Sequence, residues 1–353
     1  MNASTLAASL RSLETPEAVY RERLALAARV AGESGRVVAA LVVGSTALRR
    51  CSARADLDIV FVTGAPTGPD RFSSQVIDGV RVEVERLGRR RALACTEGDG
   101  WVWELREAAR LGCAVPVLDP TGFAAELAMR AALMAPRRAQ VEATLRDVYV
   151  ALVALGRGEG DATQRADALR GCLDNLALLA LLEHPRRYQK AKWVLADLLH
   201  AGEGPLVDAI LAAYEIDAGD GAAARDAVAG AGEVIARTYE IAGMPAHDEL
   251  LAMGHAPRFA QASYVSRCLD DAADLEASGR FVEARYVAAF AARLAAGLLW
   301  GGGGVIGTFA ERGGDELARR YLALFDGADA DDLVVEAALV AADARRERLE
   351  RPA

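Results

Sequence analysis

The sequence predicts an α+β protein with a small mixed-sheet domain over residues 1–122, followed by a larger all-α helical-bundle domain over residues 123–353. Strand patterns and turn signals are concentrated before residue 122, and helical periodicity with glycine-rich links takes over after it. Apolar residues make up 52% of the chain but aromatic residues only 6%, a composition that favours packed helices. A chain of 353 residues also exceeds the usual size of one domain.

The first domain is expected to open with a helix that packs on a sheet. Thr15-Pro16-Glu17 predicts its start, with a hydroxyl cap, a proline in the first turn and an acid beside it. The glycine-containing stretch 32–35 ends the helix. The apolar run over residues 36–43 then predicts a central strand that is buried on both faces.

Further strands and one helix complete the predicted first domain. Asp56 begins the second strand. Asp78-Gly79 is a strong hairpin signal, so we expect one strand before it and another over residues 80–87. The stretch 115–118 predicts a short edge strand, because the proline within it cannot donate to a ladder. A helix with two tryptophans is expected between these last two strands, over residues 101–111.

The second domain is predicted to consist of helices joined by glycine-rich links. Helices are expected over residues 137–156, 161–182, 189–201, 205–214, 222–242, 263–278, 281–299 and 331–349.

The second strand carries two carboxylates on one side. Because side chains alternate along a strand, Asp56 and Asp58 project to one face, and Leu57, Ile59 and Phe61 project to the other. Neighbouring carboxylates repel each other unless a cation lies between them. Hard oxygen ligands suit Mg²⁺, which is commonly bound by one or two carboxylates together with substrate phosphates. The strand therefore predicts a site for Mg²⁺ and a phosphate-bearing substrate.

The preceding strand ends at Gly44-Ser45, where glycine permits a tight turn and serine presents a hydroxyl and backbone N–H groups to phosphate. Gly44-Ser45 followed by Asp56-Leu57-Asp58 resembles the signature of the DNA polymerase β-like nucleotidyltransferase superfamily, closest to the aminoglycoside nucleotidyltransferase branch. The resemblance implies that Gly44 and Ser45 bind the nucleotide triphosphate and that Asp56 and Asp58 hold two Mg²⁺ ions. Ala55 departs from the serine that commonly precedes the first aspartate.

The resemblance also implies a third carboxylate on a neighbouring strand, which acts as a metal ligand or as the base. Glu83 and Glu85 lie on the same face of the strand over residues 80–87, so the alternation leaves both open. Glu83 fits the apolar-acidic-apolar triplet of the family best. We therefore expect Glu83 to complete the catalytic and metal-binding set, with Glu85 as the alternative.

In similar enzymes the acceptor binds between the sheet and the helical domain, and lysines of the helical domain reach the triphosphate. The matching basic segment contains Lys190 and Lys192, which we expect to bind the nucleotide. The competing interpretation is a basic first turn that packs through Tyr188 and Trp193. Asp174 and Asp197 are alternative binders for a cationic acceptor, although surface positions are favoured for both.

These residues predict an Mg²⁺-dependent nucleotidyltransferase that transfers AMP from ATP to a hydroxyl of a small molecule, such as an aminoglycoside-like or other secondary metabolite, and releases pyrophosphate. One alternative is a transferase that modifies a protein or tRNA, as in toxin–antitoxin versions of the fold. Another is a catalytically inactive nucleotide-binding module. The sequence has no signature for the nucleobase or for the acceptor.

The net charge of −9 argues against nonspecific binding to nucleic acid or membrane, and favours a cationic acceptor. The five cysteines are odd in number and contain no Cys-x-x-Cys pair, so neither a disulfide framework nor a zinc site is expected. Residues 1–14 lack the pattern of a signal peptide, which makes the cytoplasm the expected compartment. A monomer or a homodimer is compatible with the sequence.

Overall fold

The structure is a computed structural model that describes residues 15–35, 37–51, 55–64, 71–184, 190–217, 220–253, 259–299, 313–314, 316–325 and 331–350. The stretch 1–14 and Tyr188 lie outside the described residues. The chain forms two compact units. The sheet unit comprises Ala7–Val141 and Leu181–Gln189, and the helical unit comprises mainly Glu142–Ala180 and Lys190–Ala353.

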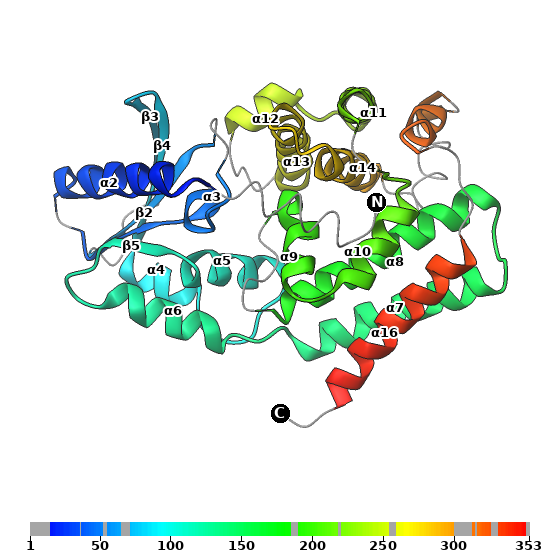
Figure 1. Ribbon diagram of the computed structural model, residues 1–353, viewed down its shortest axis with the longest axis horizontal. Coiled ribbons are helices and arrows are strands. Elements are labelled where there is room, and N and C mark those ends of the chain that lie inside the picture. Colours follow the sequence, from blue (N-terminus) through cyan, green and yellow to red (C-terminus); the bar gives the residue numbers. More distant parts are fainter. Residues whose placement is uncertain are drawn as a thin grey trace. The chain divides into compact units, whose positions relative to one another are not determined.

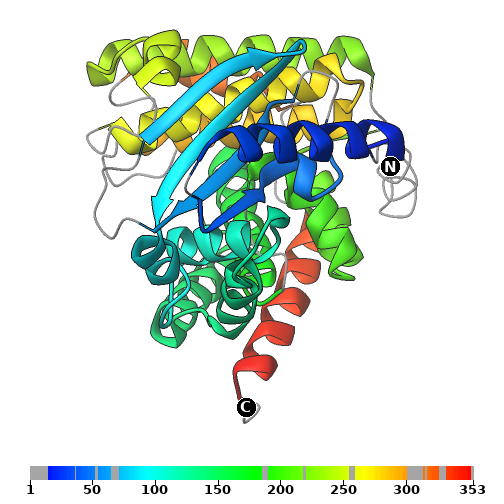
Figure 2. The same cartoon turned by 90° about the vertical axis from the view of Figure 1, so that its left-hand side faces the viewer.

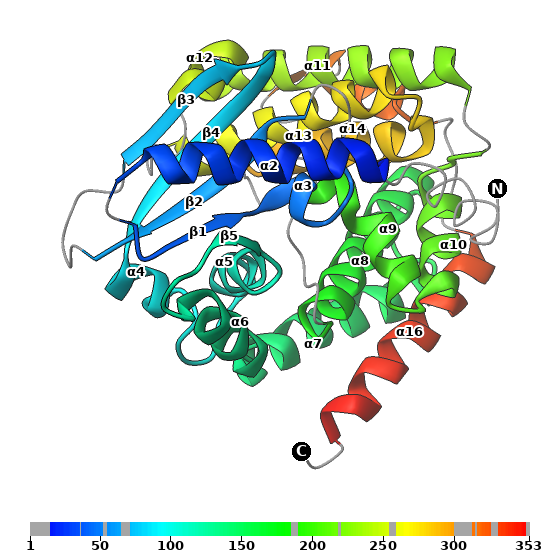
Figure 3. The ribbon, with the colours of Figure 1, turned by 60° about the vertical axis from the view of Figure 1, so that its left-hand side comes forward.

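A five-stranded mixed sheet, drawn in blue to cyan in Figure 1, forms the centre of the sheet unit. Its strand order is β3-β4-β2-β1-β5 (Figure 3). Strands β2 and β4 pair in parallel, whereas the other neighbouring strands pair antiparallel. The predicted hairpin turn is confirmed at Asp78-Gly79, and both residues have positive φ. The predicted edge strand is also confirmed. The bounds are β1 (Ala39–Val42), β2 (Leu57–Thr63), β3 (Arg71–Ile77), β4 (Val80–Gly88) and β5 (Val115–Leu118).

Helices cover both faces of the sheet, as Figure 3 shows. On one face, α2 (Glu17–Glu33) packs against apolar residues that include Leu57, Ile59 and Phe61. On the other, residues of α4, α5 and α6 pack against the alternate positions of the strands, such as Val60 and Val62. These helices span Arg89–Ala94, Val102–Gly112 and Phe123–Leu133. The second face is the one to which Asp58 belongs by alternation.

The start of α2 corrects one expectation. Pro16 is the N-cap residue, and no side chain caps the helix. The Thr15 hydroxyl instead accepts a hydrogen bond from the backbone N–H of Cys51 at 2.9 Å, so it joins two segments of the sheet unit. A buried partner far along the chain thus competes successfully with the local capping bond that the sequence suggested.

The sheet unit extends beyond residue 122, because α6 packs on α5 and on the sheet. The assignment of catalysis to the first part and of substrate contacts to the second stays a prediction. The α+β fold class, a small mixed sheet followed by a larger helical region, is confirmed.

Helices lie in each stretch that the sequence predicted as helical in this unit, but the stretch predicted over residues 189–201 divides into the 3-10 turn η1 and the short helix α9. The helices α11, α13 and α14 pack against one another (Figure 2). No described helix is both long enough and apolar enough to cross a membrane. The helix α12 (His247–Met253) was missed. The bounds are α7 (Arg138–Gly156), α8 (Ala162–Leu182), η1 (Ala191–Trp193), α9 (Val194–His200), α10 (Gly204–Ala213), α11 (Gly221–Ala242), α13 (Ala260–Ala277), α14 (Phe281–Ala296) and α16 (Asp332–Glu350).

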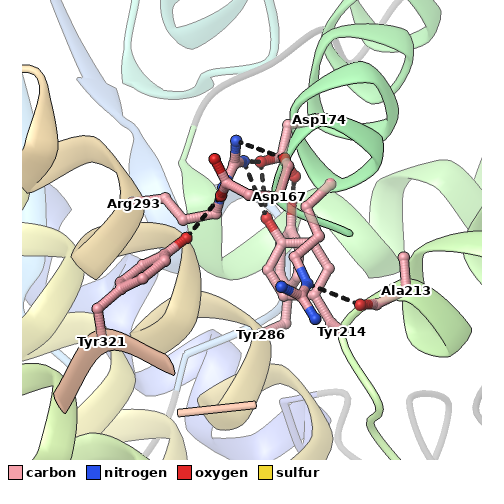
Figure 4. A network of polar contacts seen from close by, with 8 residues as sticks. Asp167, Asp174, Ala213, Tyr214, Tyr286, Arg293 and Tyr321 are labelled. Atoms are coloured by element: carbon pink, nitrogen blue, oxygen red, sulfur yellow. Dashed lines mark hydrogen bonds and ion pairs between the residues drawn. The ribbon is translucent and has the colours of Figure 1, made fainter. Parts of the chain in front are cut away.

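A buried polar network holds the helical unit together (Figure 4). Arg293 of α14 forms ion pairs with Asp167 and Asp174 of α8. Tyr214 donates to Asp174 at 2.7 Å, and Tyr321 donates to Asp167 at 2.8 Å. Burial raises the pKa of Asp174, whereas Arg293 and the tyrosine hydroxyls favour its charged form.

The expectation that Asp174 and Asp197 lie on the surface is therefore wrong. Asp174 belongs to the network, and Asp197 is 2% exposed. The helical pattern around Asp174 could not reveal this, because a buried carboxylate is stabilised by partners, and those of Asp174 include Arg293 of another helix. Asp174 joins α8 to α14 through its ion pair with Arg293, and we do not propose that it binds the acceptor substrate.

Candidate active site

The candidate site begins where β1 passes into the short helix α3 (Gly44–Ala47). Gly44 has φ of 68°, a left-handed conformation that glycine adopts without steric cost. A Cβ atom at this position would lie 2.3 Å from Oδ2 of Asp58. The Val43 N–H donates to the Asp58 carbonyl at 3.0 Å, which ties the end of β1 to β2. The Gly44 backbone therefore lies directly against the Asp58 carboxylate, closer than any other residue type permits.

Glu83 lies beside Asp58 across the sheet. In the parallel ladder of β2 and β4, Leu57 is opposite Val82 and Asp58 is opposite Glu83. Directly opposite residues share a face, so the two carboxyl groups project to the same side on neighbouring strands. Both side chains are half-buried. The sequence predicted that these two residues belong to one site, and the register brings them together.

Glu85, the alternative third carboxylate, has an identified partner. Its Oε2 atom lies 2.6 Å from Nη2 of Arg110 in α5, and the same nitrogen lies 3.0 Å from Glu107. Burial would lower the pKa of Arg110, but Glu107, Glu85 and Asp58 raise it above its ordinary value. The positive charge of Arg110 is thus held in place by Glu85 and Glu107.

Asp56 precedes β2 and lies next to an arginine. Oδ1 of Asp56 is 3.7 Å from Nε of Arg81, whose side chain is 63% exposed. The backbone around Asp56 is held by two hydrogen bonds. The buried Arg23 of α2 donates to the carbonyl oxygens of Ala55 at 2.7 Å and Asp56 at 3.2 Å. An exposed pair at this distance is weak. The anchored backbone, more than the ion pair, determines where Asp56 lies.

Ser45 and Thr46 follow Gly44 in α3, and both are buried. Thr46 is fully buried, and its hydroxyl oxygen has no hydrogen-bond partner among the residues that the structure describes. An unpaired buried hydroxyl costs free energy, and such groups are rare unless a water or a ligand completes them. The Thr46 hydroxyl thus has an unused hydrogen-bonding capacity, but it is enclosed by the protein.

The predicted nucleotide-binding lysines lie in the helical unit, at η1. Lys192 forms an ion pair with Asp271 of α13, and its side chain is 16% exposed. Both lysines lie near Trp193, which is buried, with Nζ of Lys190 5.6 Å from the ring centroid. These contacts give the lysines a place in the packing of the helical unit. Their contact with a nucleotide stays a prediction.

The donor set suits a hard divalent cation. Among the described residues, no group of three or more His, Cys, Asp or Glu side chains is gathered closely enough to form a metal cage. Mg²⁺ does not require one, since it is usually held by one or two carboxylates while water and substrate phosphates complete its octahedron. Asp58 and Glu83 provide such a pair, and the Gly44 backbone lies directly against the Asp58 oxygen.

Sequence reasoning missed two arginines of this site. Arg81 stands two residues before Glu83 on the same strand, so the alternation that grouped Glu83 with Glu85 also places Arg81 on their face. That signal was present in the sequence. Arg110 lies on a helix 25 residues after Glu85, and no local pattern connects the two.

No protein-family model matches the chain, and no curated protein has a significantly similar sequence. Among solved structures, the chain is similar to the crystal structure of a nucleotidyltransferase-like protein from Exiguobacterium sibiricum 255-15. The sequence identity is 11% and the TM-score is 0.31; the match covers 52% of this chain and 65% of that one, which is less than two thirds of its length. A likeness of this extent carries no argument about the reaction, so the functional assignment depends on the residues described above.

Proposed function

We propose that the protein is an Mg²⁺-dependent nucleotidyltransferase that transfers AMP from ATP to a hydroxyl of a small molecule, such as an aminoglycoside-like or other secondary metabolite. The observation that carries the proposal is the pairing of Asp58 with Glu83 next to the Gly44 backbone. Two neighbouring carboxylates beside the backbone of a glycine turn suit a polyphosphate and its metal better than they suit a structural core.

Each residue has a role in this reaction. Asp58 and Glu83 would hold Mg²⁺ together with Asp56, and the metal when bound would supply positive charge for the triphosphate. The N–H groups and hydroxyls of the turn that contains Ser45 bind phosphate oxygens. Lys190 or Lys192 is the proposed further contact of the triphosphate.

In the chemical step, the acceptor oxygen attacks the α-phosphorus and its proton passes to the Glu83 carboxylate. The new oxygen–phosphorus bond forms as the bond between the α-phosphorus and the bridging oxygen breaks, and pyrophosphate leaves with that oxygen. The chain contributes position and charge, and no covalent intermediate is required. We choose Glu83 over Glu85 as the base because Glu83 lies directly opposite Asp58 in the ladder of β2 and β4.

The test is pyrophosphate release with Mg²⁺ and each of the four ribonucleoside triphosphates, with and without a panel of hydroxylated and aminated metabolites. We expect release that depends on one nucleotide and one acceptor. Asp58→Asn should abolish release, whereas Asp78→Asn is the matched control in the exposed hairpin turn. Full activity of Asp58→Asn would refute the assignment. Nucleotide binding without release in the wild-type protein would direct the search to protein or RNA acceptors.

A further inference from the structure

The edge strand β3 has an unusual distribution of side chains. All of its residues from Phe72 to Val76 are exposed, and the two large apolar side chains are Phe72 and Val76, which are 65% and 71% exposed. Ser73 and Gln75 project to the opposite face. An edge strand normally turns its apolar side chains toward the core and its polar ones toward water. In β3 the apolar side chains of Phe72 and Val76 are instead exposed to solvent.

The register of the hairpin places this apolar pair on the face of the candidate site. Phe72 is opposite Glu85, Ser74 is opposite Glu83, and Val76 is opposite Arg81. Ser74 therefore stands beside Glu83, with backbones about 5 Å apart, and Phe72 and Val76 flank it along the strand, about 13 Å from each other. We call Phe72, Ser74 and Val76 the β3 platform. Figures 2 and 3 show β3 and β4 as two long arrows that run side by side.

The β3 platform and the Gly44 turn lie on opposite sides of the two carboxylates. Across the sheet the order is Ser74, Glu83, Asp58 and then the end of β1, which leads to Gly44. In nucleotidyl transfer the attacking and leaving oxygens lie roughly in line on opposite sides of the phosphorus. If the triphosphate lies at the Gly44 turn, the attacking hydroxyl must approach from the β3 side.

We propose that the β3 platform binds the acceptor, and that the acceptor is an amphiphilic alcohol with a flat apolar or aromatic group next to its reacting hydroxyl. Phe72 contacts the flat group at one end of the acceptor, Val76 contacts the other end, and the Ser74 hydroxyl hydrogen-bonds to the acceptor between them, beside Glu83. This proposal rests on the proposed function, because it uses that function's orientation of the triphosphate. The carboxylates and the phosphate-binding turn do not select the acceptor. The β3 platform adds residues that do.

The alternative ligands of an exposed aromatic residue differ in testable ways. A nucleobase stacked on Phe72 would place the nucleotide on the β3 side of the carboxylates, opposite to the turn that suits phosphate. A second copy of the chain that added a strand to β3 would make the oligomeric state depend on the same side chains.

The experiment compares aryl glucosides with methyl glucoside as acceptors, using isothermal calorimetry without nucleotide and pyrophosphate release with ATP. The variants are Phe72→Ser, Val76→Ser and Ser74→Ala. The controls are Gln75→Ser and Ser73→Ala, on the other face of the same strand. These exposed positions are suited to substitution, because surface changes have small effects on stability.

We expect the wild-type protein to prefer aryl glucosides. Phe72→Ser and Val76→Ser should each weaken their binding and raise their KM about 10-fold, the order expected for losing one buried apolar side chain. Ser74→Ala should do so up to about 10-fold, the order expected for losing one hydrogen bond. The KM of ATP should not change, and the controls should resemble the wild type. Aryl glucoside binding that is lost in the variants, without any pyrophosphate release, would support the platform and refute nucleotidyl transfer to these alcohols.

Three results would overturn the platform and leave nucleotidyl transfer standing: pyrophosphate release with an unchanged acceptor KM in all three variants, a raised KM for ATP alone, or a change in sedimentation without a change in acceptor binding. If no aryl glucoside binds to the wild-type protein, the platform proposal also fails.

Discussion

Substitution of Gly44 by alanine tests whether activity depends on the contact between Gly44 and Asp58 or only on the stability of the fold. Gly44 has φ of 68°, and an added Cβ would lie 2.3 Å from Oδ2 of Asp58, closer than nonbonded atoms can approach. Gly122 provides a matched control. Its φ is 71°, and an added Cβ would meet no atom within 4 Å. Both alanine variants carry the same backbone strain, and only one displaces a carboxylate.

The magnitudes follow from this difference. A left-handed conformation costs a non-glycine residue about 1–2 kcal/mol, so Gly122→Ala should lower the free energy of unfolding by that amount. Gly44→Ala should lower it by at least as much, because Asp58 must also move. Displacing a catalytic group by about 1 Å can cost about 100-fold in rate. We therefore expect kcat/KM to fall about 100-fold in Gly44→Ala and to remain at the wild-type value in Gly122→Ala.

The assays are urea unfolding followed by circular dichroism and pyrophosphate release under Mg²⁺ and ATP. A folded Gly44→Ala protein with normal kcat/KM would refute the argument that the close approach of the Gly44 backbone positions Asp58. Equal losses of activity in the two variants would show that stability, and not the contact with Asp58, determines the rate.

Further predictions concern the carboxylates, the lysines and pH. Glu83→Gln should lower kcat at least 100-fold, on the order expected for losing a general base. Glu85→Gln should mainly lower stability, by up to about 1 kcal/mol, because the amide oxygen can still accept a hydrogen bond from Arg110 and only the charge of the pair is lost; equal, mild kinetic effects would contradict both roles. Lys192→Ala should raise the Kd of ATP while Asp271→Asn, which breaks the same ion pair, should not, as calorimetry can show. Burial raises the pKa of Tyr239 to about 12 from its ordinary 10. The stability contributed by its neutral hydroxyl is therefore complete below pH 10 and is lost as the pH rises toward 12, and urea unfolding of Tyr239→Phe should show less of this alkaline loss.

Much of the helical region could be predicted because its helices end at local signals. The sequence predicts a helix over residues 222–242, and α11 spans Gly221–Ala242 with Asp220 as its N-cap and Gly243 in a left-handed C-cap. Both signals are single residues whose preference comes from their own hydrogen bonding or backbone freedom. Boundaries of this kind need no knowledge of the tertiary structure.

Features that depend on distant partners were not predictable. Thr15 has the sequence of a helix cap, but its hydroxyl binds Cys51 across 36 residues. Asp174 was expected on the surface, and its partner Arg293 lies 119 residues away. In both cases a polar side chain is satisfied by a residue that no local pattern identifies. A sequence shows that such a group needs a partner, and only the packing shows which one it has.

The candidate site illustrates how a local pattern and a distant register combine. Alternation alone put Asp56 and Asp58 on one face and Glu83 and Glu85 on one face, but it left open whether the two pairs meet. Strands β2 and β4 are parallel and separated in sequence by β3, so their register is set by packing and not by a turn.

That packing lies on the opposite face of the sheet. Leu57 is opposite Val82 and Ile59 is opposite Val84, and all four are buried under α2. A shift by one residue would move these side chains into water and turn the carboxylates into the core, so the apolar face specifies the register strongly. The core residues under α2 therefore determine that Asp58 meets Glu83, and that Glu85 meets Arg110 instead. The proposed division of roles between the two glutamates would thus be a consequence of hydrophobic packing on the opposite face of the sheet.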